Sequence, residues 1–152
     1  MRRALNCDWQ VLVKETVKPT ILLRICSLLT LLHAVMHTAG VLSSPKHGPE
    51  EIAVIQTMKS HFFEVYGSTR SYWDFLLGYG LFLTTGLLLQ AVFLWQLSTL
   101  SRANPDWTKS VVALFFLNCV VMAVLSWRYF FIGPALIQFS VAACLALAFA
   151  TA

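Results

Sequence analysis

Residues 75–101 read FLLGYGLFLTTGLLLQAVFLWQLSTLS, and no side chain in this stretch carries a formal charge at neutral pH. A helix needs about 20 apolar residues to cross a hydrocarbon core of about 30 Å. Further uncharged and mostly apolar intervals occur at residues 25–45, 110–127 and 129–152. Because backbone N–H and C=O groups find no water inside a bilayer, segments of this kind are expected to be helices.

The composition agrees with a membrane protein. Hydrophobic residues make up 58% of the 152-residue chain and charged residues only 12%, against roughly 25% charged residues in ordinary soluble domains. These values argue against a disordered chain, a coiled coil and a nucleic-acid-binding protein. We therefore predict a multi-pass protein of the cell membrane, with the lipid bilayer as its first partner and no nucleic-acid partner.

We predict an all-α fold, in which a four-helix transmembrane bundle carries an amphipathic interfacial helix between spans 1 and 2. The whole chain, residues 1–152, forms a single membrane domain. Its expected segments are a cytoplasmic or interfacial N-terminus over 1–19, spans at 20–42, 72–97, 110–129 and 132–151, and an outer helix at 49–66.

Helix-boundary signals support these limits. Pro19 and Pro105 suit first helical turns, where a missing N–H costs nothing. Ser71 and Asp74 have the spacing of a capping box at the start of the second span. The Gly133-Pro134 pair indicates a tight turn, which predicts that the third and fourth spans are antiparallel neighbours.

The orientation follows from lysine and arginine, which concentrate in cytoplasmic loops. With the N-terminus inside, the cytoplasmic set is the larger one; it comprises Arg2, Arg3, Lys14, Lys18, Arg24, Arg102 and Lys109, and the outer set Lys46, Lys59, Arg70 and Arg128. Both termini are therefore predicted to be cytoplasmic. A cleaved signal peptide is the alternative for the first span, but its apolar run contains two histidines and the stretch before it is long for the charged region of a signal peptide.

The segment between the first two spans is patterned like a helix. Gly48-Pro49-Glu50-Glu51 resembles a helix start with acids near the positive end of the dipole, and Gly67 is a natural helix stop. Apolar and polar side chains fall on opposite faces of a helix over 49–66. The apolar face comprises Ile52, Ile55, Met58, Phe62, Phe63 and Tyr66, and the polar face Glu50, Thr57, His61 and Glu64. We expect this helix to lie on the outer surface or to cover the bundle.

The first span carries a stripe of polar or small residues on one helix face, namely Cys26, Thr30, His33, His37, Gly40 and Ser44. Polar groups at membrane depth face the bundle interior, because contact with lipid is costly. The inward-pointing partners expected on other spans are Gln138, Asn118, Ser126, Asp74, Gly78 and Thr85.

Four hypotheses account for this stripe. In the first, His33 and His37 hold a metal ion completed by His61 or Glu64. In the second, haem is ligated with the help of His61 or His47. In the third, His33, His37, His61, Glu64 and Asp74 form a catalytic set for acid–base chemistry on a lipophilic substrate. In the fourth, favoured one, histidine and glutamine hydrogen-bond between helices, so no cofactor is expected.

Two further patterns bear on function. The four cysteines, Cys7, Cys26, Cys119 and Cys144, contain no CxxC pair, which disfavours a thiol–disulfide role. The alanines Ala142, Ala146 and Ala150 form a small-xxx-small strip that permits close helix packing within or between chains.

The run RSYWDFLLGYG at residues 70–80, together with the histidine-bearing first span, resembles small uncharacterised bacterial four-span membrane proteins over about residues 20–150. This resemblance implies the four-span fold and transfers no activity and no catalytic residue. The architecture alone is similar to that of small membrane isomerases of sterol-like lipids. Those proteins carry acidic residues within the membrane, whereas none lies deep in a span here.

These observations together predict a small integral membrane protein that binds a lipid or lipophilic molecule or acts as a subunit of a membrane complex. A membrane enzyme using the histidine and glutamate set is the alternative. A lipophilic ligand, other membrane subunits or a second copy of the chain are the partners expected beside the bilayer.

Overall fold

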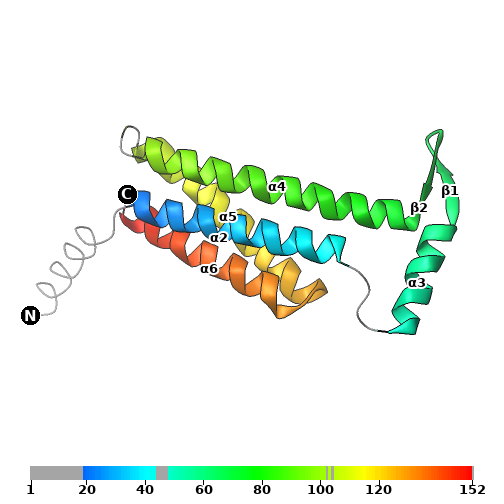
Figure 1. The fold of residues 1–152 in the computed structure, drawn as a ribbon. Helices are drawn as coiled ribbons and strands as arrows, with labels where there is room; N and C mark the ends of the chain where they lie inside the picture. Colours follow the sequence, from blue (N-terminus) through cyan, green and yellow to red (C-terminus); the bar gives the residue numbers. More distant parts are fainter. Residues whose placement is uncertain (1–18, 44–47, 102, 104, 152) are drawn as a thin grey trace, which may run out of the picture. The chain divides into compact units, whose positions relative to one another are not determined.

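The computed structural model describes residues 19–43, 48–101, 103 and 105–151. The elements in chain order are α2 (Pro19–Leu42), α3 (Pro49–Ser60), β1 (Phe62–Val65), β2 (Ser68–Ser71), α4 (Tyr72–Leu100), α5 (Pro105–Tyr129) and α6 (Ile132–Thr151) (Figure 1). Four helices, α2, α4, α5 and α6, are long and apolar enough to cross a membrane by length and composition. The predicted all-α architecture, with a short helix between the first two spans, is confirmed. Most of the predicted N-terminal segment lies outside the described residues.

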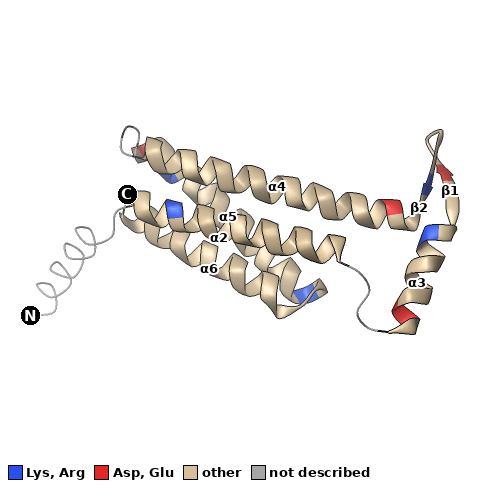
Figure 2. Cartoon of the chain, viewed as in Figure 1, with Lys and Arg blue, Asp and Glu red and all other residues tan. Residues whose placement is uncertain are grey.

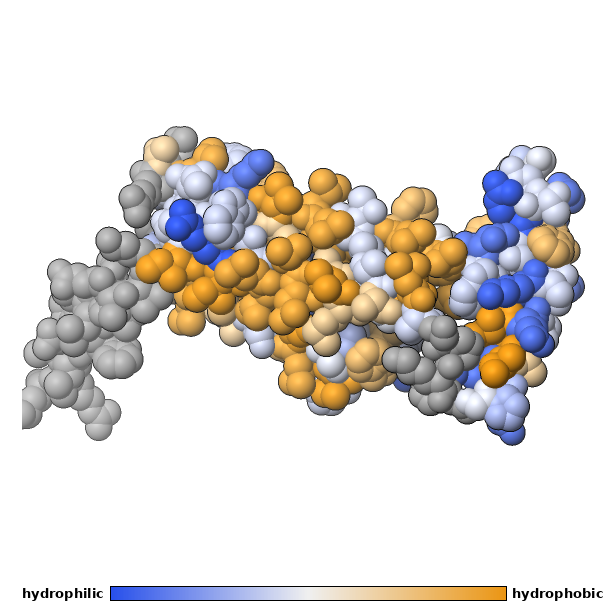
Figure 3. All heavy atoms as spheres, in the orientation of Figure 1, coloured by the Kyte–Doolittle hydropathy of each residue, from blue (hydrophilic) through white to orange (hydrophobic). Residues whose placement is uncertain are grey.

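Charged side chains are placed as a membrane protein requires. Among the described residues, those on the four long helices occur near the helix ends, and α3 and the hairpin carry the remaining ones (Figure 2). Arg24 lies in an early turn of α2, and its guanidinium stands 5.2 Å from the centre of the Trp95 ring, a distance suited to cation–π attraction. The surface of the long helices seen in Figure 3 is mostly apolar, as lipid contact demands.

Packing divides the chain into two units, which are described separately. Among the described residues, the first comprises 19–33 with 88–101, 103 and 105–151, and the second 34–43 with 48–87. Helices α2 and α4 therefore contribute one part to each unit.

In the first unit, α5 and α6 are antiparallel neighbours, as predicted, because only Phe130 and Phe131 separate them. Their packed faces join the early part of α2 and the late part of α4 in one core cluster, whose fully buried members include Leu23, Leu94, Cys119 and Leu145. Hydrogen bonds accompany this packing: the Ser27 hydroxyl donates to the Ala91 carbonyl at 2.7 Å.

The predicted alanine strip of α6 is split by the structure. Ala142 is buried, whereas Ala146 and Ala150 are exposed. A step of four residues advances about 40° beyond a full helical turn, so residues spaced in this way drift off a straight contact line. The small buried positions of α6 are instead Ala135, Ala142 and Ala148.

The second unit corrects the predicted outer helix. Helix α3 ends at Ser60, and the residues up to Ser71 form an antiparallel hairpin in which Phe62 pairs with Ser71 and Val65 with Ser68. The prediction of one helix over 49–66 was wrong for its last turns. None of the α3 residues is buried. The amphipathic character of this helix and its contact with a membrane surface stay predictions.

The turn chemistry explains why a hairpin forms. Tyr66 and Gly67 both have positive φ angles, 50° and 78°, as a two-residue turn of type I′ requires. Gly67, interpreted from sequence as a helix stop, supplies one of these angles without steric cost. The flanking residues are rich in aromatic, β-branched and hydroxyl side chains, which suit a pleated surface better than a helix.

The predicted capping box at the start of α4 is confirmed. Asp74 Oδ2 accepts hydrogen bonds from the Ser71 backbone N–H at 2.8 Å and from the Ser71 hydroxyl at 2.9 Å. The Asp74 N–H donates to Ser71 Oγ at 3.2 Å. Ser71 is thus the last residue of β2 and also the cap of α4, so the hairpin continues into the helix without a linker.

Candidate functional site

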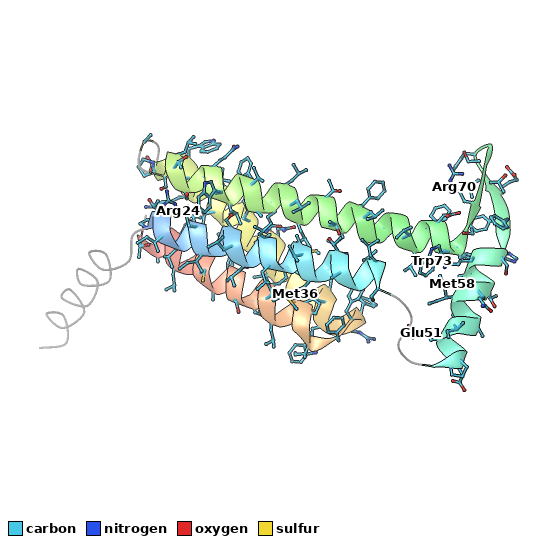
Figure 4. The ribbon with its side chains drawn as sticks, viewed as in Figure 1. Arg24, Met36, Glu51, Met58, Arg70 and Trp73 are labelled. Carbon is cyan, nitrogen blue, oxygen red and sulfur yellow. The ribbon has the colours of Figure 1, made fainter. Side chains whose placement is uncertain are left out.

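A groove of about 270 Å³ lies in the second unit, on the exposed face of the first turns of α4. Its lining residues are Arg70, Asp74, Phe75, Gly78, Tyr79 and Phe82. Figure 4 labels Arg70 on the hairpin and Trp73 in the first turn of α4, the two elements that form the mouth of the groove.

The apolar part of the groove follows from residue spacing. Phe75, Tyr79 and Phe82 are separated by four and three residues, which places them on one helix face. Their exposed fractions are 38%, 69% and 76%. Between them Gly78 leaves a gap, since a Cβ added there would meet nothing within 4 Å. The result is a notch between aromatic side chains on a surface open to the surroundings.

The polar end of the groove combines one cation with a carboxylate that is already engaged. Arg70 is exposed, and its Nη1 donates to the Thr69 carbonyl at 2.7 Å. Asp74 Oδ2 is held by the Ser71 cap described above. Guanidinium groups carry several N–H donors, so Arg70 keeps donors for an anionic ligand.

Ring contacts position the hairpin against the start of α4. The Phe63 ring lies 4.8 Å from Tyr72 and 5.7 Å from Phe75, measured between centroids. His61 also stacks on Tyr72, with 5.6 Å between the ring centroids. These contacts fix the hairpin that carries Arg70 next to the helix that carries the groove.

His33, the first of the predicted catalytic residues, belongs to the first unit and is buried. The Gln138 side-chain N–H donates to His33 Nδ1 at 3.4 Å, which corresponds to the imidazole tautomer protonated at Nε2. The favoured hypothesis of hydrogen bonds between histidine and glutamine of different helices is therefore confirmed for His33 and Gln138.

The second predicted residue, His37, belongs to the second unit and is half-buried. Its Nε2 lies 3.1 Å from the Gly80 carbonyl oxygen, which can only accept, so Nε2 carries the proton. The hydroxyl of Thr38, the residue after His37, lies 3.0 Å from the hydroxyl of Thr84, one turn beyond Gly80 on α4. Two polar contacts thus join the end of α2 to the first half of α4.

The remaining predicted residues also have partners of their own in the second unit. His61 stacks on Tyr72, Glu64 accepts a hydrogen bond from the Thr69 hydroxyl across the hairpin, and Asp74 caps α4. Each described contact is of a kind that supports the fold. An acid–base role for these side chains stays a prediction.

The metal and haem hypotheses gain no support from the described residues. No group of three or more histidine, cysteine or acidic side chains among them is arranged to hold a metal ion. His47, invoked for haem, and Cys7 lie outside the described residues. The thiols of Cys26, Cys119 and Cys144 are free.

Several predicted inward-pointing residues are placed differently. Ser126 and Gln138 are buried as expected, but Asn118, Asp74 and Thr85 are exposed. The face of α4 that meets α2 in the second unit carries Gly80 and Thr84 instead. Sequence reasoning also missed the groove residues Arg70, Phe75, Tyr79 and Phe82, although the spacing of the three aromatic residues was a visible signal.

The four long apolar helices are compatible with a multi-pass membrane protein. Comparisons of the chain with protein-family models, with curated proteins and with solved structures found no match. Function is therefore inferred from the residues of this chain.

The Gln138–His33 hydrogen bond yields a first testable expectation. Replacing Gln138 by leucine keeps the side-chain size but removes the donor, so we expect the free energy of unfolding to fall by about 0.6 to 1.7 kcal/mol. The measurement is a denaturing-detergent titration of the purified protein in micelles.

Gln96→Leu is the matched control, because Gln96 is exposed on α4 and its replacement is expected to change stability by less than about 0.5 kcal/mol. Adding His33→Leu to Gln138→Leu is expected to cost less than the sum of the single losses. Equal stability of Gln138→Leu and the wild type would contradict the interaction.

Proposed function

We propose that this protein binds an amphipathic lipid with an anionic headgroup in the groove of α4. The observation that carries the proposal is the groove itself. The Arg70 cation stands at its mouth beside the Asp74 carboxylate that caps α4, and exposed aromatic rings flank an open notch along a helix that is long and apolar enough to span a membrane. Ligand sites of this kind are mostly apolar, with few polar groups that fix orientation.

The chemistry of the two ends specifies the ligand. Arg70 suits a phosphate or carboxylate, because its fork of donors matches two acceptor oxygens. From Asp74 to Phe82 the helix rises by about 12 Å, a length suited to part of one acyl chain. The open side of the groove lets such a chain enter laterally from the bilayer.

Photo-crosslinking in vesicles tests the proposal directly. Purified protein is placed in vesicles of phosphatidylcholine with a minor fraction of phosphatidylglycerol carrying a photoreactive acyl chain. We expect crosslinks on peptides containing residues 75–82. Gly78→Leu fills the notch and is expected to reduce this labelling severalfold, whereas Gly86→Leu, which also adds a side chain in open space on α4, leaves it unchanged.

The headgroup preference needs its own comparison. Arg70→Gln is expected to abolish the preference for photoreactive phosphatidylglycerol over photoreactive phosphatidylcholine while labelling by the latter persists. Equal labelling of the wild type and the Gly78→Leu variant would refute the groove as the binding site. Equal labelling by both lipids in the wild type would refute the anionic headgroup.

We also propose that both termini face the cytoplasm, which puts the hairpin outside. The support is the excess of lysine and arginine on the inner side. In a variant lacking the native cysteines, Ser68→Cys is expected to react with an impermeant maleimide on intact cells. Ala103→Cys, between α4 and α5, is expected to react only after permeabilisation. The reverse pattern would invert the topology.

A further inference from the structure

The placement of Asn118, in the described part of α5, runs against the rule for membrane helices. It lies near the midpoint of α5 (Pro105–Tyr129), about 20 Å from one end and about 17 Å from the other. Its side chain is exposed rather than directed into the bundle. An amide at this depth would contact hydrocarbon, where an unsatisfied donor or acceptor is costly.

Two other exposed polar groups of the long helices differ from Asn118. The Thr85 hydroxyl donates to the Leu81 carbonyl at 3.0 Å, and the Ser140 hydroxyl donates to the Leu136 carbonyl at 2.8 Å. Each group is satisfied by its own helix. The Asn118 amide makes no hydrogen bond to any described residue, so a partner from outside this part of the chain is required.

The residues around Asn118 form a seam for helix packing. Leu114, Asn118, Val121 and Leu125 are all exposed, and their spacing of four, three and four is that of the core positions of a coiled coil. A single polar residue in such a seam fixes register and the number of helices. This face of α5 therefore has the pattern of a helix–helix interface with a hydrogen bond at its centre.

We propose that the partner is a second copy of this chain, in a parallel dimer formed by the α5 seam, with Asn118 of each copy bonded to Asn118 of the other. A two-fold axis along the membrane normal brings every residue to the same depth as its own copy. The carboxamide contains both donor and acceptor groups. Two Asn118 side chains across this axis satisfy each other reciprocally, without any other polar residue.

Energy transfer in vesicles measures this association. Protein labelled with donor and acceptor dyes is reconstituted over a range of protein-to-lipid ratios, and transfer is expected to rise as for a monomer–dimer equilibrium. Asn118→Leu keeps the seam apolar but removes the amide pair. It is expected to weaken dimerisation about tenfold, whereas Asn118→Gln retains an amide and a measurable dimer.

Two controls separate the interface from loss of folding. Asn118 is exposed, so its leucine variant is expected to keep the helix content of the wild type and, in dilute micelles where both are monomeric, its melting temperature. Ala146→Leu, at an exposed position of α6, is expected to leave dimerisation unchanged. A wild type that stays monomeric at every ratio, or a dimer that Asn118→Leu does not weaken, overturns the proposal.

Discussion

Replacing Gly80 by alanine is expected to lower the free energy of unfolding by about 1 to 3 kcal/mol, and replacing it by leucine is expected to lower it further. A Cβ at Gly80 would lie 2.8 and 2.9 Å from the two methyl carbons of Val41, closer than carbon atoms normally approach. The same contact region contains the His37–Gly80 hydrogen bond. Overpacking here therefore forces α2 and α4 apart at the point where a polar side chain joins them.

The chain offers matched controls for this expectation. Gly86 lies on the same helix, and a Cβ added there meets nothing within 4 Å. Gly86→Ala is thus expected to be neutral or stabilising, because alanine favours helix more than glycine does. Val41→Ala added to Gly80→Ala is expected to recover part of the loss. If Gly80→Ala were as stable as Gly86→Ala in denaturing-detergent titrations, the close approach of Gly80 to Val41 would not contribute to stability.

Replacing Ala123 by leucine is the second substitution with a large expected effect. Ala123 is fully buried on α5, and in a membrane the association of helices depends on close packing rather than on removal of apolar surface from water. A leucine at this position pushes neighbouring helices apart and is expected to cost about 1 to 3 kcal/mol. Thermal denaturation in micelles is expected to show a clear fall in midpoint temperature.

Ala146→Leu makes the same chemical change at an exposed position of α6. It is expected to leave the midpoint almost unchanged, because the added side chain contacts only detergent or lipid. If Ala123→Leu and Ala146→Leu both had the midpoint temperature of the wild type, Ala123 would not lie at a tight helix contact.

The four long apolar helices were predictable because ionised side chains are excluded from hydrocarbon, and the neutral intervals coincide with these helices. The end of the outer helix at Ser60 was not predictable in this way. Helical periodicity of apolar residues and strand alternation overlap in the short run before Gly67, and the left-handed angle at Tyr66 arises from turn geometry. Periodicity alone does not separate these structures over so few residues.

The inward faces of the helices were predictable only in part. The stripe on α2 pointed correctly to His33, because polar residues contrast with leucine there. Helix α4 offers no such contrast: it is apolar all round, and lipid and neighbouring helices accept the same side chains. Gly78 was therefore expected to face inward, although it lies in the open groove, and Gly80 at the helix contact was overlooked.

The direct junction of hairpin and helix at Ser71 has a consequence for how this sequence tolerates insertions and deletions. One added residue between Gly67 and Ser71 would reverse the alternation of β2 and move Arg70 to the opposite side of the strand. One added residue between Ser71 and Asp74 would break the reciprocal cap. Point substitutions are thus expected to be accepted far more readily in this segment than any change in its length.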